Sequence, residues 1–432
     1  MSNWHYKWGV DIALPPLGEH SKAKHNVYRE YLKRYLRELT KSGRISRLQI
    51  NIVDGFSGGG AYSPEHGPGP YFGSPIILIE TLREMQIELQ ARRREPFLLD
   101  YRVHLVDQDR AAHAVLRRTL TEQGFGALIG ERVFLHTSTF EDALPSLLID
   151  VNGRGATIFI LDQFGYTQVP FSLLETIFSK LTKPEVILTF AYDQLETWVR
   201  DYDRVNRRLT NLGVGAIRRD EFEAALKEHN GREFFIQRTL HKSFLSFAKY
   251  YTPFFVMSRK SNMAFWLVHL SVHARARDVM TALHWEMQNS FAHFGGVGHN
   301  MLGYDPNNPP PKAQAYFFDD DAHSRTLWKL QDDLPPLIFA YRDGVEFRQF
   351  FADIANESPG DSELLKQALI GLGEVGTVRI LTKDGNEKRS IASLGPTDRL
   401  ILPNQPTFFF TGRPPPLFAR QPKSRKVNEP SK

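Results

Sequence analysis

The sequence contains no cysteine in its 432 residues. That absence excludes a disulfide framework, a cysteine-bound zinc or iron–sulfur cluster, and a thiolate nucleophile. A run of eighteen apolar residues is also lacking, and the first twenty residues carry charges, tryptophan and proline where a signal peptide has an apolar segment. We therefore expect an intracellular, cytoplasmic protein with neither a membrane-spanning segment nor a membrane partner.

The remaining composition is that of an ordinary soluble globular protein, with 41% hydrophobic and 24% charged residues. A chain of this length has room for two or three domains. Its formal net charge of +5 is a mild basic bias over a large surface, which permits an anionic partner without requiring one.

After a helix expected over residues 22–42, strand-like and helical patterns alternate along the chain. Strand-like runs fall at 49–54, 101–107, 132–137, 156–162 and 185–192, with helical patterns at 75–94, 110–123, 141–151 and 171–181. This alternation predicts an α/β fold with a parallel, doubly wound sheet. Two further apolar runs, 252–258 and 263–272, predict an antiparallel hairpin at its end. That ending is typical of class I methyltransferases.

The rest of the chain predicts a second domain. A loop rich in glycine, proline and asparagine covers roughly 292–335, and beyond it the order helix, helix, strand, turn, strand is that of a winged helix. We expect a methyltransferase-like domain at 1–300 with a helical insertion at 195–250, a linker at 301–336, a winged-helix domain at 337–402 and a basic tail at 403–432.

The strongest chemical signal is the segment 54–60, Asp-Gly-Phe-Ser-Gly-Gly-Gly, directly after the first predicted strand. Glycine lets the backbone approach a ligand closely and take positive φ, and α/β folds bind nucleotides at the carboxyl ends of parallel strands. A flexible turn is the alternative interpretation. The residues predicted to bind a cofactor here are Asp54, Gly55, Phe56, Gly58 and Gly60.

An NAD site fits this loop poorly. Its fingerprint, Gly-x-Gly-x-x-Gly, opens a helix directly. Counted from Gly58, the third glycine would fall on Ser63, and the helix begins only near Ser74.

Acidic residues follow the second and third strands. Asp107 is placed to accept hydrogen bonds from ribose hydroxyls, and Asp109 to cap the next helix. Glu141, with Thr139 and Asp142, lies where a polar group facing adenine is expected, although helix capping explains these residues equally well.

The fourth strand is followed by Asp162, Phe164 and Tyr166, which we predict to hold the acceptor. The carboxylate can orient an N–H group, and an aromatic ring can stack on a planar substrate. A loop with buried aromatic residues is the alternative. The histidine clusters lack the carboxylates that would complete a metal site, so we expect no metal.

With the 54–60 loop, the Gly-Ser-Pro of 73–75 and the Leu-Asp-Gln-Phe-Gly of 161–165, the chain resembles the three-Cys-motif partner protein (TcmP) family over roughly residues 20–300. The resemblance implies a domain that binds S-adenosyl-L-methionine (SAM) and acts with a separate, cysteine-bearing partner, the three-Cys-motif protein. Gln163 departs from the family, which usually has a proline there; proline would stiffen the substrate-facing loop.

The leading hypothesis is a SAM-dependent methyltransferase that modifies a nitrogen or oxygen of a nucleic acid, DNA or RNA. SAM supplies the reactive sulfonium, so the protein would contribute positioning and electrostatics. A non-catalytic, cofactor-binding scaffold subunit is the main alternative, and an NAD-dependent enzyme is a third. Four basic residues predict that the winged helix contacts duplex DNA, with protein docking as the alternative: Arg379, Lys383, Lys388 and Arg389.

Overall fold

The computed structural model describes residues 6–64, 69–163, 167–190, 201–227, 231–257, 264–287, 292–294, 315–317, 320–388 and 393–403. Its centre is a nine-stranded sheet in the order β11-β10-β8-β9-β7-β6-β1-β4-β5. The parallel strands are β1 (Arg47–Asp54), β4 (Leu98–Val106), β5 (Val133–His136), β6 (Ala156–Leu161) and β7 (Pro184–Phe190).

The sheet ends on an antiparallel hairpin. β9 (Ala264–Ser271) pairs antiparallel with β7, and β8 (Tyr250–Met257) pairs antiparallel with β9. The short strands β10 (Ala292–Phe294) and β11 (Ala315–Phe317) extend that edge. When β1, β4, β5, β6, β7, β8 and β9 are numbered 1 to 7 in chain order, their order across the sheet is 3-2-1-4-5-7-6. Only strand 7, which is β9, runs antiparallel to the others. The predicted doubly wound sheet with a terminal hairpin is therefore confirmed.

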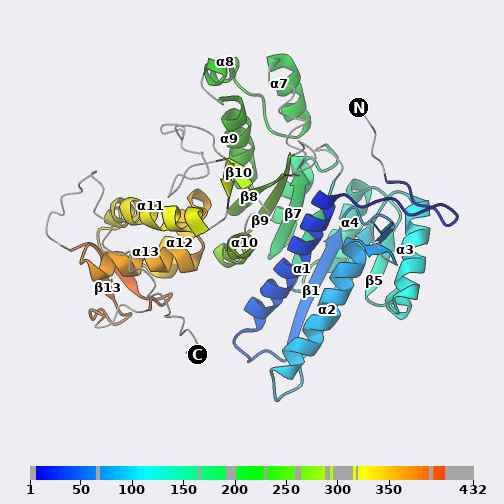
Figure 1. Ribbon diagram of the computed structural model, residues 1–432, viewed down its shortest axis with the longest axis horizontal. Coiled ribbons are helices and arrows are strands. Elements are labelled where there is room, and N and C mark those ends of the chain that lie inside the picture. The colour runs from blue at the N-terminus through cyan, green and yellow to red at the C-terminus, as the bar shows by residue number, and fades with distance from the viewer. Residues whose placement is uncertain are drawn as a thin grey trace, which may run out of the picture.

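Helices cover both faces of this sheet, which is why β6 and β7 are buried along their whole length. On one face α1 (Glu19–Thr40) and α2 (Ser74–Ala91) lie side by side, as Figure 1 shows, and α3 (Arg110–Glu122) and α10 (Ala274–Glu286) join the same core. On the other face lie α4 (Phe140–Val151) and α5 (Phe171–Lys180).

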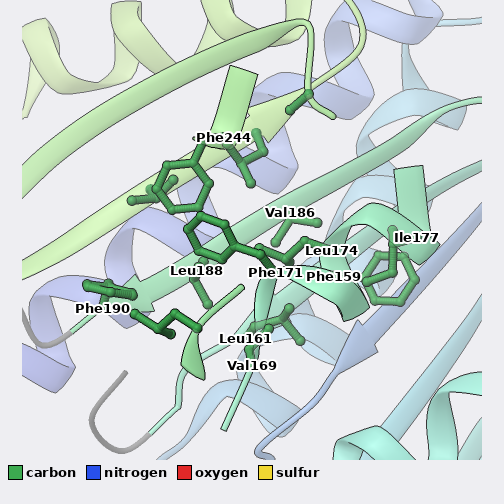
Figure 2. Close-up of a cluster of buried hydrophobic side chains, with 14 of the residues drawn as sticks. Phe159, Leu161, Val169, Phe171, Leu174, Ile177, Val186, Leu188, Phe190 and Phe244 are labelled. Atoms are coloured by element: carbon green, nitrogen blue, oxygen red, sulfur yellow. The ribbon is translucent and has the colours of Figure 1, made fainter. Parts of the chain in front are cut away.

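Among the described residues, the segment between β7 and β8 carries the helices α7 (Tyr202–Asn211), α8 (Arg219–Lys227) and α9 (Gly231–Leu245). Figure 2 shows Phe244 of α9 next to Phe171 of α5, and their ring centroids are 4.7 Å apart. α9 of this segment therefore packs against α5 in the hydrophobic core of this face.

A second unit follows, with its own core and a three-stranded sheet in the order β12-β14-β13. Its elements are α11 (Asp320–Phe339), β12 (Val345–Glu346), α12 (Phe347–Ile354), the 3₁₀ turn η2 (Ala355–Glu357), α13 (Ser362–Glu374), β13 (Arg379–Leu381) and β14 (Arg399–Ile401). β14 lies between the other two strands and pairs antiparallel with both.

The predicted boundary of this unit was wrong. Residues 320–336, assigned to the linker, form most of α11, which packs against α13. Leu330, Leu334 and Ile338 recur at four-residue spacing and are buried, so the segment has an apolar face that the neighbouring Pro335 and Pro336 obscured in the sequence.

The second unit is docked on α10. The buried guanidinium of Arg277 donates to the carbonyl oxygens of Ser358 and Gly360. Asp278 accepts from the backbone N–H and the hydroxyl of Ser362, both at 2.7 Å. Buried hydrogen bonds of this kind hold the two units together. Among the described residues, no helix combines the length and the apolar character needed to cross a bilayer.

Candidate functional site

β1 ends at Asp54, whose side chain is fully enclosed beneath the glycine loop. It accepts hydrogen bonds from the Ser74 hydroxyl at 2.7 Å and from the Phe56 backbone N–H at 3.2 Å. Burial raises the pKa of Asp54 to about 7, against the effect of those two hydrogen bonds. Asp54 therefore ties the end of β1 to the start of α2 and shapes the loop from behind.

The loop itself turns at Gly58 and Gly60, with φ of +58° and +70°. Both are in the left-handed region that favours glycine. A Cβ on Gly55 would lie 2.7 Å from the Leu161 side chain and 3.0 Å from that of Phe140, so a larger residue would have to displace them. The half-buried Phe56 packs near Phe140 at the start of α4.

Asp107 lies at the end of β4 and is bonded to the loop. One carboxylate oxygen accepts from the Gly58 N–H at 2.9 Å and the other from the Asp109 N–H at 2.8 Å. The side chain is partly exposed, and each oxygen retains a further lone pair for a ribose hydroxyl. Asp109 caps α3 by accepting from the Ala111 N–H.

The residues after β5 follow the capping alternative. Thr139 accepts from the Asp142 N–H at 3.1 Å and caps α4. Glu141 is exposed in the first turn of that helix. Its predicted role toward adenine stays a prediction.

Trp8 is a residue of this site that the sequence reading missed. Its indole lies on the glycine loop, since a Cβ on Gly58 would meet the ring at 2.7 Å and one on Gly59 at 2.2 Å. Its Nε1–H donates to the Ala61 carbonyl at 3.0 Å. Gly58 and Gly59 thus leave room for this indole, and any ligand of the loop must share the site with it.

Asp162 follows β6 and forms an ion pair with Lys24 of α1. The Lys24 ammonium donates to the Asp162 carboxylate at 2.5 Å, and the two side chains are 6% and 22% exposed. Burial acts to raise the pKa of Asp162, but the charge and hydrogen bond of Lys24 outweigh it and hold that pKa below its usual value. Asp162 is thus an ionised hydrogen-bond acceptor. Phe164 and Tyr166 lie outside the described residues.

Gln163 is bonded to the residues that precede α5. Its side-chain oxygen accepts from the backbone N–H groups of Gln168 and Val169, both at 3.0 Å. Its Nε2, in a side chain only 3% exposed, has no hydrogen-bond partner within the described residues.

His25, adjacent to Lys24, adds a second unpaired donor or acceptor. Its side chain is 5% exposed, and its Nδ1 finds no partner in the ranges given above. Burial lowers the pKa of His25 to about 4, despite the opposing charge of Asp162, so the ring is neutral at physiological pH. An unpaired buried polar atom can be satisfied by water or by a bound polar ligand.

An aromatic cluster joins this pair to the glycine loop. The ring centroids of Tyr6, Trp8 and Tyr62 are 5.3–5.7 Å apart, and that of His25 is 6.4 Å from Tyr62. A signal for Lys24 was present in the sequence. It precedes Tyr28 by four positions on the apolar face of α1, and a lysine on a buried face requires a partner.

No family model matches the chain, and no curated protein matches it. Similar solved structures include a Legionella pneumophila protein of the family DUF519, 12% identical, covering 62% of this chain and 92% of its own, with a TM-score of 0.35. An rRNA methylase from Streptococcus thermophilus is 12% identical, with coverages of 56% and 95% and a TM-score of 0.26. The Streptococcus mutans protein SMU.1697c, solved with SAH, is 11% identical, with coverages of 59% and 99% and a TM-score of 0.27. At these scores the fold assignment rests on the strand order itself, 3-2-1-4-5-7-6, which is that of class I methyltransferases.

Proposed function

We propose that the protein binds SAM at the carboxyl ends of β1 and β4 and transfers its methyl group to an acceptor held beside Asp162. One observation carries the proposal. In a sheet with the class I strand order, Asp107 follows β4, and Asp162, which is paired with Lys24 of α1, follows β6. β4 and β6 are the two strands that flank β1 and its glycine loop. Ligands bind at this end of open α/β sheets.

The residues fit the cofactor in two respects. Asp107 is partly exposed and retains lone pairs for the two ribose hydroxyls. Gly58 and Gly60 bring the backbone close to that carboxylate, and the half-buried Phe56 borders the same edge. Bound SAM would supply an electrophilic methyl group.

The chain would supply hydrogen-bonding groups that orient the acceptor. Lys24 keeps Asp162 ionised, which makes it a good hydrogen-bond acceptor for an N–H or O–H of the substrate and a weak base. The neutral His25, next to Lys24 on α1, has an Nδ1 that is unpaired among the described residues. Because its pKa is lowered to about 4 it is also a weak base, so these groups would orient the acceptor rather than drive its deprotonation.

We further infer membership of the TcmP family, with a three-Cys-motif protein as partner and a nucleic acid as acceptor. The support is the occurrence of the three motifs in order. Gln163 departs from the third motif, and its side chain is bonded to the backbone of Gln168 and Val169. The C-terminal unit is proposed to be a winged helix. Its elements end on the strands β13 and β14, and β14 also pairs with β12, the first strand of the unit.

Contacts in that unit favour docking over DNA recognition by the wing. Arg379 is paired with Glu387 at 3.1 Å, and Lys388 with Asp398 at 2.5 Å. The first turn of α13 is bonded to α10 through Ser362. A scaffold subunit that docks a partner through this unit is therefore the second candidate function.

Transfer from labelled SAM to separate DNA, RNA and protein pools tests the proposal. We expect the wild type to label one pool, and His25→Gln and Asp162→Asn to lose transfer while retaining SAH affinity. SAH binding without label in any pool would favour the scaffold. Full transfer by Asp162→Asn would show that the acceptor binds elsewhere.

A further inference from the structure

A cleft of about 820 Å³ lies between the two units of the molecule. Its walls come from the second half of α1, the end of α2, α10 and the start of α13. Arg37 lines it and follows Lys24 by 13 positions on α1, which at 1.5 Å per residue is about 20 Å. The cleft is therefore separate from the proposed methyl-transfer site, although one helix joins them.

The cations of this cleft are oriented by carboxylates that lie behind them. Glu88, 29% exposed, accepts from two nitrogens of Arg37 at 2.8 Å each and also pairs with Arg92 at 2.8 Å. The Arg92 side chain is 60% exposed. One shielded carboxylate thus holds two guanidinium groups that face the solvent.

The same arrangement recurs at Glu38, the residue after Arg37 on α1. Glu38, 18% exposed, pairs with Arg275 at 2.8 Å and with Lys41 at 2.5 Å, and these two cations are 52% and 65% exposed. Arg275 also binds the buried Asp278 at 2.6 Å. The carboxylates are again enclosed and the cations exposed.

A fifth cation, Arg93, is bonded to the carbonyl oxygens of Thr40 and Ile45, which do not neutralise its charge. Arg34 of α1 also lines the cleft and pairs with Glu286, and Lys366 of α13 lines it together with Asp361 and Glu363. With Glu88 and Glu286 included, seven cations face six carboxylates, a net excess of one positive charge. The wing of the C-terminal unit, where DNA contacts were predicted, has its Arg379 and Lys388 in one-to-one ion pairs instead.

We propose that this cleft binds the phosphate groups of a polynucleotide. Guanidinium groups match phosphate geometry, and groups already held by carboxylates lose little side-chain entropy when they bind. A strand seated here would lie about 20 Å along α1 from Asp162, so the cleft would anchor the ligand at a distance from the reacting group. Binding here does not depend on methyl transfer and can be measured without SAM.

The test is fluorescence anisotropy of the full chain with a labelled 20-nucleotide RNA and with a labelled duplex DNA of the same length, at 50–200 mM salt. The variant Lys41→Gln/Arg92→Gln removes two exposed cations of the cleft. Its matched control, Lys383→Gln/Arg379→Gln, removes two from the wing. Circular dichroism of each variant confirms the fold, and thermal shift with inorganic tripolyphosphate separates free phosphate groups from a polynucleotide as the ligand.

We expect the cleft variant to lose at least tenfold in affinity for one of the two polynucleotides and the control to lose less than twofold. The slope of log affinity against log salt should fall by about 1.4 for RNA or about 1.8 for duplex DNA. Four results would overturn the proposal. They are an equal loss in both variants, a loss confined to the wing variant, no polynucleotide binding by the wild type at 50 mM salt, and stabilisation by tripolyphosphate alone.

Discussion

Lys24→Met is the most informative single change, because it leaves the buried carboxylate of Asp162 without its cation. Removing one partner of a buried ion pair costs about 3–5 kcal/mol, since the remaining charge stays desolvated. We expect the free energy of unfolding at pH 7.5 to fall by that amount, measured by urea denaturation followed by circular dichroism. Lys41, whose side chain is 65% exposed, is the control. Its partner Glu38 keeps Arg275, so Lys41→Met should cost less than about 1 kcal/mol.

The pH dependence should change sign in this variant. In the wild type the folded pKa of Asp162 is below its ordinary 3.8, so its contribution is present above that pH and is lost as the pH falls through the lowered value. Without Lys24, burial raises the pKa of Asp162, and protonation at pH 5 should recover part of the lost stability. Lys24→Met/Asp162→Asn should recover most of it at pH 7.5. A loss below 1 kcal/mol at both pH values would refute the account of this pair.

Three further outcomes follow from the geometry. Asp107→Ala should weaken SAH binding by about 1.5–3 kcal/mol in calorimetry, and an unchanged affinity would remove Asp107 from the cofactor site. Gly59→Ala should cost about 1–3 kcal/mol of unfolding free energy, because its Cβ would collide with Trp8, and almost nothing in a Trp8→Ala background; equal costs would contradict the packing. Asp54 has a folded pKa of about 7, so its contribution to the free energy of unfolding is fully present below pH 3.8 and is lost as the pH rises through 7. Relative to the wild type, Asp54→Asn should therefore gain about 3 kcal/mol of stability between pH 5 and pH 8. A difference that does not change with pH would refute the raised pKa.

The fold of the first domain could be predicted because its strands are short apolar runs separated by helices of regular length. β6 and β7 are buried on both faces and carry continuous apolar residues, which is the pattern of a parallel sheet. α11 could not be predicted, since Pro335 and Pro336 near its end are typical of a loop and its apolar face shows only against α13.

The site was predictable where one residue follows one strand, and not where distant segments meet. Asp107 and Asp162 were placed correctly at the ends of β4 and β6. Trp8 and Lys24 reach the same edge from the N-terminal segment and from α1. The sequence indicates that Lys24 needs a partner but not that this partner is Asp162, and no local pattern indicates the contact of Trp8 with the glycine loop. Asp54 was predicted to bind the cofactor, whereas its enclosed carboxylate accepts hydrogen bonds from Ser74 and from the loop backbone.

Titration calorimetry of the full chain with SAH and with NAD tests the central claim most directly. The strand order and the partly exposed Asp107 beside the glycine loop predict saturable, one-site binding of SAH and no heat with NAD. Binding of NAD with no response to SAH would contradict the assignment of this edge of the sheet to SAM.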